Sequence, residues 1–211
     1  MSRMINGIFP GRIEPSVMLA GNIAVYENIW PNPEQTIEAA NNECANPESG
    51  AYWRRAETHG QGAHQTHRTN KLLDITHLAT VNDNKLLQNI HNQFYMLLMA
   101  ASVPYAERCQ ITETLFHEGY CLLKYSNDQE YKQHYDTDTS GGRIISCICY
   151  LNNDFEGGEL EFPNFDIKIK PQPGMLILFP SNYAYTHIAH PVTSGKKYAL
   201  VTWIKDRDLN A

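Results

Sequence analysis

Two histidines and one aspartate have the residue types and the spacing of a metal-binding triad. His134 and Asp136 are separated by one residue, and His187 follows much later in the chain. Alternate residues of a β-strand point to the same face, so His134 and Asp136 can enter one cavity together. Two imidazoles and one carboxylate on one face of a metal leave the opposite face open, an arrangement typical of non-haem Fe(II) centres.

A His-x-Asp doublet alone is weak evidence for a metal site. The chain contains 9 histidines, and such a doublet also fits a half-exposed histidine beside a turn. The interpretation therefore depends on whether the neighbouring segments can build a cavity and bring a third ligand to it.

The second half of the chain contains short apolar or alternating segments separated by turn residues. Segments of this length, rich in β-branched residues, are typical of strands and are short for helices. The expected strands cover residues 121–125, 143–151, 159–162, 167–170, 175–179 and 198–204. Strands at this spacing predict an antiparallel sandwich or barrel, of which a jelly roll is one form, with the metal site at its mouth.

Four separate stretches, in their order and spacing, resemble the prolyl 4-hydroxylase-like branch of the 2-oxoglutarate (2OG) and Fe(II)-dependent dioxygenases. They are YSNDQEYKQHYD at 125–136, YLNNDFEGGELEFP at 150–163, PQPGMLILFPS at 171–181 and HIAHPVTSGKKYALVTW at 187–203. The resemblance extends over residues 115–206. It implies an α+β fold with a double-stranded β-helix (jelly-roll) core and N-terminal helices packed on one sheet.

The resemblance also implies roles for individual residues. The implied Fe(II) ligands are His134, Asp136 and His187. Lys197 would pair with the far carboxylate of 2OG, because burying an unpaired charge is very costly. Tyr125 and Thr193 would add hydrogen bonds in the same pocket. The implied cofactors are Fe(II), 2OG and O2, with ascorbate as reductant.

Two neighbouring residues compete for these assignments. His190 lies close to His187, but the family pattern places the ligand before Pro191-Val192-Thr193 at a distance that favours His187. Lys196 competes with Lys197. Because alternate strand residues face opposite ways, only one of these lysines can enter the pocket, and the family spacing favours Lys197.

Further residues are candidates for contact with the substrate: Tyr131, Arg143, Trp53 and Arg54. Packing is an equally good interpretation for Tyr131, and a solvated strand start is the alternative for Arg143. Leu160 stands where the family usually has threonine, which puts in doubt any polar contact from that position.

The polar, glycine-containing segment 46–70 is predicted to be a mobile loop that closes over the substrate as a lid. It contains His59, His64 and His67, whose spacing also allows a zinc site. No cysteine or acidic residue completes a recognisable ligand spacing there, so the lid is the favoured interpretation.

The N-terminal half contains signals for a strand and two helices. Residues 23–30 read as a strand. Asn32 is expected to cap a helix that has Pro33 in its first turn, and Asp83 to cap a longer one. The longer helix should end at Pro104, and its apolar stripe comprises Leu86, Leu87, Ile90, Phe94, Leu97, Leu98 and Ala101.

Length and composition agree with one domain over residues 1–211, in which 1–110 supports a metal-binding core at 115–206. With 211 residues and 42% hydrophobic content, a full core needs no disulfides. Five cysteines, an odd number, fit reduced thiols and a cytoplasmic protein. No apolar run predicts a membrane span or a signal peptide. A net charge of −6 without a basic stripe argues against nucleic-acid partners.

We therefore predict a 2OG- and Fe(II)-dependent dioxygenase that hydroxylates an unactivated C–H bond. Peptidyl-proline 4-hydroxylation, with release of succinate and CO2, is the favoured reaction, so the expected partner is a proline-containing peptide or protein. One alternative is hydroxylation of a free amino acid or of another protein side chain. The other is a non-catalytic jelly-roll binding module, which would have no need for all three ligand candidates and Lys197. The oligomeric state is not predicted.

Overall fold

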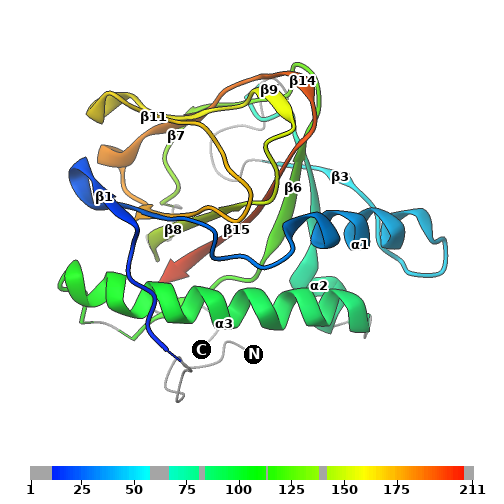
Figure 1. The fold of residues 1–211 in the computed structure, drawn as a ribbon, viewed down its shortest axis with the longest axis horizontal. Helices are drawn as coiled ribbons and strands as arrows, with labels where there is room; N and C mark the ends of the chain where they lie inside the picture. The colour runs from blue at the N-terminus through cyan, green and yellow to red at the C-terminus, as the bar shows by residue number, and fades with distance from the viewer. Residues whose placement is uncertain (1–10, 58–66, 81–83, 113, 138–141, 207–211) are drawn as a thin grey trace.

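The computed structural model describes residues 11–57, 67–80, 84–112, 114–137 and 142–206. Its strands form two antiparallel sheets and a short strand pair, and helices cover the outer face of the larger sheet (Figure 1). The predicted α+β class is therefore confirmed, as is the packing of N-terminal helices on one sheet.

The larger sheet provides the platform on which the helices pack. Among the described residues it has nine strands, and β5 (Phe116–His117) joins it by pairing with β15. The other eight follow the order β1 (Val17–Leu19), β2 (Ile23–Tyr26), β12 (Leu176–Pro180), β8 (Arg143–Tyr150), β15 (Lys197–Lys205), β6 (Cys121–Tyr125), β4 (Lys71–Asp74) and β3 (Arg54–Arg55).

The smaller sheet lies against the other face of the larger one. In the described part of the chain its strands follow the order β11 (Ile167–Ile169), β10 (Leu160–Phe162), β13 (His187–Ala189) and β7 (Tyr131–His134). A separate antiparallel pair is formed by β9 (Phe155–Gly157) and β14 (Val192–Gly195). Strands β10 and β11 correspond to the strands predicted at 159–162 and 167–170, whereas β7, β9, β13 and β14 lie outside the predicted strand ranges.

Strand β8 shows why the central strands read as nearly continuous apolar runs. Ile145, Cys147 and Cys149 pack into the core beneath the helices, whereas Tyr150 packs into the core between the two sheets. Because both faces of the strand are buried, both sets of alternating side chains are apolar. Ser146 is the exception, and it is buried on the face that carries the candidate site.

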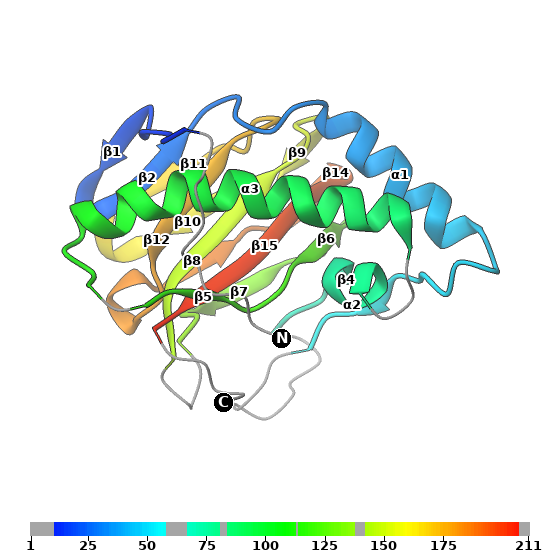
Figure 2. The same ribbon diagram turned by 90° about the horizontal axis from the view of Figure 1, so that it is seen from below.

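The long helix α3 (Lys85–Arg108) runs across the outer face of the larger sheet, as Figure 2 shows. Its buried stripe matches the prediction except at Leu86, which is exposed. The helix does not end at Pro104 as predicted, but continues through it. Pro104 has no N–H to offer the carbonyl of Ala100, and the backbone N–H of Ile13 donates to that oxygen instead, at 2.9 Å. A tertiary contact thus removes the usual penalty.

The predicted helix caps need correction. Asn84 caps α3, with its side chain accepting a hydrogen bond from the backbone N–H of Leu87 at 3.0 Å; Asp83 lies outside the described residues. Helix α1 (Pro33–Ala45) begins where expected, but Asn32 is left-handed and its side chain makes no capping bond. An N-cap residue normally has extended backbone geometry, and Asn32 does not.

Strand β2 ends at Tyr26, so the predicted strand at 23–30 is shorter than expected. Asn28 adopts a positive φ of 53°, a left-handed conformation that turns the chain out of the sheet. Helix α2 (Ile75–Thr80), which packs beside α3, was not predicted.

The segment 46–70 is not a loop throughout. Arg54 and Arg55 form the edge strand β3, which pairs with β4, and Asn70 is fully buried. His59 and His64 lie outside the described residues. The described parts of this segment are therefore anchored to the larger sheet, and the lid remains a prediction.

The chain shows no helix, among the described residues, that is long and apolar enough to cross a membrane. All five cysteines are free thiols, in agreement with the expectation of reduced cysteines.

Candidate metal centre

The two candidate histidine ligands face each other across neighbouring strands of the smaller sheet. His134 ends β7 and His187 begins β13, and the two residues are register partners in the antiparallel ladder. Their ring centroids are 4.2 Å apart. Pairing of β7 with β13 therefore brings together two residues that are remote in sequence.

Both imidazoles are oriented by backbone carbonyls. Nδ1 of His134 lies 2.7 Å from the carbonyl oxygen of Lys132, and Nδ1 of His187 lies 3.0 Å from that of Tyr185. Because a carbonyl only accepts, each Nδ1 is the protonated donor and each Nε2 keeps its lone pair. Burial, followed by the nearby His187, holds the pKa of His134 well below its usual value, so its ring is neutral at neutral pH.

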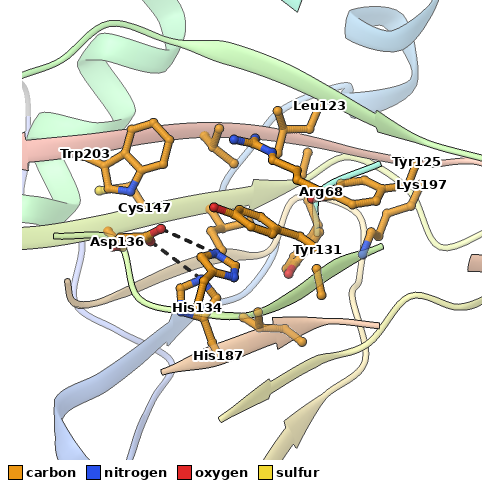
Figure 3. A pocket seen from close by; sticks show the side chains of 17 residues that line it. Arg68, Leu123, Tyr125, Tyr131, His134, Asp136, Cys147, His187, Lys197 and Trp203 are labelled. Atoms are coloured by element: carbon orange, nitrogen blue, oxygen red, sulfur yellow. Dashed lines mark hydrogen bonds and ion pairs between the residues drawn. The ribbon is translucent and has the colours of Figure 1, made fainter. Parts of the chain in front are cut away.

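Asp136 completes the group from just beyond the end of β7. Its Oδ1 lies 3.6 Å from Nε2 of His134 and its Oδ2 lies 3.7 Å from Nε2 of His187, the contacts drawn in Figure 3. The candidate ligand atoms of the three residues all lie within 4.8 Å of one another. The backbone N–H of Asp136 donates to the carbonyl of Ser181 at 3.1 Å, so a loop of the larger sheet fixes its position.

The surroundings of Asp136 keep its carboxylate ionised. Burial alone would raise its pKa, but the two histidines and hydrogen bonds from the side chains of Ser146 and Trp203 together lower it. The site therefore offers one carboxylate and two imidazoles, which is the donor set of a facial triad for Fe(II).

A buried lysine lies on the same cavity wall. Lys197 is only 1% exposed, and its Nζ donates to the carbonyl of Gly158 at 2.7 Å and lies 4.3 Å from the ring centroid of Tyr125. Burial lowers its pKa to about 7. Figure 3 shows Lys197 and Tyr125 at one end of the cavity and Trp203 at the other.

These residues fit Fe(II) and 2OG. The three ligand candidates provide the hard and borderline donors that Fe(II) accepts. Lys197 makes no ion pair with a carboxylate among the described residues, and a buried ammonium without an anion is unfavourable. A carboxylate of 2OG would supply the missing anion.

Three further residues, Lys196, His190 and Thr193, lie away from the cavity. Lys196 is exposed while Lys197 is buried, as strand alternation predicted. Nε2 of His190 lies 2.6 Å from Oε2 of Glu161 and does not join the three-residue group. Thr193, predicted to line the pocket, is exposed, because its neighbour Val192 takes the inward position on β14.

Tyr131 lines the cavity and stacks on His134, with ring centroids 3.4 Å apart. On its other side, the guanidinium of Arg68 lies 4.7 Å from the ring centroid of Tyr131. Arg68 also lines the cavity and brings a cation to it (Figure 3). No sequence pattern pointed to Arg68, because it lies in a polar stretch without periodicity.

The other substrate candidates do not line the cavity. Arg143 forms an ion pair with Glu118 at 2.5 Å and lies 3.8 Å from the ring centroid of Trp203. Trp53 packs against Lys124 in the layer beneath the helices, and Arg54 pairs with Asp74 at 3.3 Å. Roles for Trp53 and Arg54 in substrate contact are not supported by these positions.

Comparison with known proteins finds similarity in the part of the chain that forms the β core. Residues 120–205 match the model of the 2OG-Fe(II) oxygenase superfamily. A protein of Acanthamoeba polyphaga mimivirus named as a prolyl 4-hydroxylase is 32% identical over 110 residues, covering 43% of this chain and 46% of the relative. Human prolyl 3-hydroxylase 2 is 41% identical over 92 residues, covering 41% of this chain and 13% of the relative. Residues 120–205 therefore resemble a 2OG-Fe(II) oxygenase domain.

The chain spans less than half the length of the mimivirus relative and a smaller part of the human one. Solved structures share its fold at low sequence identity. A Trichoplax adhaerens prolyl hydroxylase gives a TM-score of 0.69 at 19% identity, covering 89% of this chain and 84% of that one. A Pseudomonas putida prolyl-4-hydroxylase gives a TM-score of 0.62 at 18% identity, covering 90% of this chain and 95% of that one.

Proposed function

We propose that this chain is a 2OG- and Fe(II)-dependent dioxygenase that hydroxylates peptidyl proline at C4, with a jelly-roll core formed by its two sheets. The observation that carries the proposal is the presence, within one cavity, of the His134–Asp136–His187 group and a buried lysine that forms no ion pair in the described part of the chain. The family match of residues 120–205 supports the same chemistry.

In this proposal His134, Asp136 and His187 hold Fe(II), and Lys197 holds the far carboxylate of 2OG beside the Tyr125 ring. Bound Fe(II) and 2OG together supply the oxidising power that places an oxygen atom from O2 on a substrate carbon, with release of succinate and CO2. The carbonyls that accept from the two Nδ1 groups hold both imidazoles with Nε2 toward the metal. Ascorbate is the proposed reductant.

The walls of the cavity exclude water from this chemistry. Leu123, Ile148, Leu160 and Val201 contribute apolar surface to it, and a dry site strengthens the pairing of Lys197 with a carboxylate. Leu160, the departure from the family pattern, lies within this apolar wall. Arg68 and Tyr131 are the proposed contacts to the peptide, since they bring a cation and an aromatic face to the same cavity.

The substrate class rests on the relatives. The curated relatives are named for hydroxylation of proline at C4 or at C3, and the Trichoplax neighbour was solved with a peptide fragment. A proline-containing peptide therefore fits the proposed activity better than a free amino acid.

The test is incubation of the protein with Fe(II), 2OG, ascorbate and a panel of proline-containing peptides. We expect succinate release and a mass gain of one oxygen atom on proline, with amino-acid analysis identifying 4-hydroxyproline. The variant His187→Ala should lose bound iron and turnover, whereas His190→Ala, whose ring pairs with Glu161, should keep both. Iron retained by His187→Ala and lost by His190→Ala would reverse the ligand assignment.

A further inference from the structure

Two buried serines form a hydrogen-bonded chain that ends on the carboxylate of Asp136. The Oγ of Ser146, on β8, donates to Oδ2 of Asp136 at 2.7 Å. The Oγ of Ser181, just after β12, lies 2.9 Å from the Oγ of Ser146. These two hydrogen bonds connect the neighbouring strands β8 and β12 of the larger sheet to Asp136, which follows β7 of the smaller sheet.

The direction of this chain follows from the chemistry of its members. An ionised carboxylate only accepts hydrogen bonds, so the single hydroxyl proton of Ser146 points to Asp136. The Ser146 oxygen can then only accept from Ser181, which makes Ser181 the donor of the second bond. A proton donated to an ionised group makes a stronger hydrogen bond than one shared between neutral groups.

Burial makes both hydrogen bonds costly to lose. Ser146 and Ser181 are each 1% exposed, so water does not readily replace a missing partner. Ser181 is fixed by its backbone as well: its carbonyl accepts from the N–H groups of Asp136 and Thr137, and its N–H donates to the carbonyl of Ile144 at 3.0 Å.

We propose that Ser146 and Ser181 are positioning residues that set the orientation of the Asp136 carboxylate toward the metal. The Ser146 hydroxyl acts directly, and the Ser181 hydroxyl acts through Ser146. The inference rests on the proposed function, because it takes Asp136 as a metal ligand. Outer partners of this kind commonly change metal affinity by about 10- to 100-fold when they are removed.

The test uses Co(II), which has a visible absorption spectrum sensitive to its ligand geometry, in the purified full chain. We expect Ser146→Ala to weaken Co(II) binding by about 10-fold and to change the spectrum. Ser181→Ala, which keeps its backbone bonds, should weaken binding by a smaller factor. The double variant should match Ser146→Ala alone, because the Ser181 hydroxyl reaches Asp136 only through Ser146, and the backbone bond between Ser181 and Asp136 is kept in every variant.

A matched control is available in Ser102 on α3. It is fully buried like the two serines, but its Oγ has no hydrogen-bond partner among the described residues. Ser102→Ala should leave Co(II) affinity and spectrum unchanged, which separates a general effect of a buried Ser→Ala change from loss of support to Asp136.

The outcomes separate the two proposals. If the unmodified protein does not bind Co(II), the proposed function fails. If it binds Co(II) and Ser146→Ala has the same affinity and spectrum, only the positioning role is overturned. Additive effects of the two serine substitutions would show that Ser181 does not act through Ser146. Ser146→Ala could fail to fold, which circular dichroism without metal would reveal. In that case, an unchanged Co(II) spectrum and Co(II) affinity in Ser181→Ala would by themselves overturn the proposed positioning role of the two serines.

Discussion

At the residue scale, Lys197 is a lysine side chain in a buried environment. It is buried beside the Tyr125 ring, and its Nζ donates to one backbone carbonyl. Burial lowers its pKa to about 7, so near neutral pH the lysine is held between its charged and neutral forms. A bound carboxylate would favour the charged form, which links the occupancy of the site to pH.

The variant Lys197→Ala should weaken 2OG binding much more than metal binding. Removing one partner of a buried ion pair costs about 3–5 kcal/mol, or roughly a hundredfold or more in affinity. Lys196→Ala is the matched control: Lys196 is exposed, and an exposed charge contributes at most about 1 kcal/mol. Isothermal titration of 2OG with Mn(II) present measures both. The opposite order of effects would assign the pocket to Lys196.

The affinity for 2OG should also depend on pH in a defined direction. Above pH 7 the free protein holds Lys197 neutral, so binding of a dicarboxylate must take up a proton and weakens as pH rises. Below pH 7 the lysine is already protonated, so its protonation no longer makes the 2OG affinity depend on pH. In Lys197→Arg the guanidinium stays charged, so the decrease between pH 7 and 9 should disappear. The same slope in both proteins would exclude Lys197 as its origin.

At the element scale, α3 is held to the larger sheet by its buried stripe and by tertiary hydrogen bonds at its proline. Phe94 is fully buried and makes edge contacts with the rings of Trp30 and Tyr120. The N–H of Ile13 satisfies the carbonyl that Pro104 leaves without a partner. The helix therefore depends on the sheet and on the N-terminal segment for its full length.

Phe94→Ala should lower the free energy of unfolding by about 3–5 kcal/mol, because it removes a large buried ring and leaves a cavity. Met96→Ala is the control on the same helix, since Met96 is 39% exposed, and it should stay within about 0.5 kcal/mol of the unmodified protein. Urea denaturation followed by circular dichroism measures both. Equal effects of the two substitutions on the free energy of unfolding would contradict the assignment of Phe94 to the buried stripe of α3.

At the scale of the whole molecule, the candidate site spans both sheets. His134 and His187 come from the smaller sheet, Lys197 and Ser146 come from the larger one, and Asp136 bonds through its backbone to Ser181. Metal and 2OG would thus connect the two layers of the sandwich. Ligands that bind only the folded state stabilise it by mass action.

Mn(II) and 2OG should therefore raise the unfolding temperature together. A ligand at 100 times its Kd adds about 2.7 kcal/mol, which for a domain of this size is roughly 5–10 °C. Asp136→Ala should abolish the shift on adding Mn(II), whereas Lys197→Ala should keep it and lose the further shift on adding 2OG. Differential scanning fluorimetry measures both. A full Mn(II) shift in Asp136→Ala would place the metal elsewhere.

The sequence by itself determined the parts of the site that depend on local pattern. Alternation and motif spacing brought His134, Asp136, His187 and Lys197 into one prediction, and the structure places all four on one cavity. Six strands of the second half were predictable because they are short apolar or alternating segments bounded by turn residues. Strand alternation allowed only one of Lys196 and Lys197 to enter the pocket, and the spacing of the family motif selected Lys197.

Tertiary structure decided what depends on contacts between distant segments. Only the packing of β8 beside β12 puts Ser146 and Ser181 in contact. The passage of α3 through Pro104 depends on Ile13, and the approach of Arg68 to the cavity depends on its pairing with Tyr131. Such partners are remote in sequence and leave no periodic signal, because their hydrogen bonds form only once the sheets have assembled.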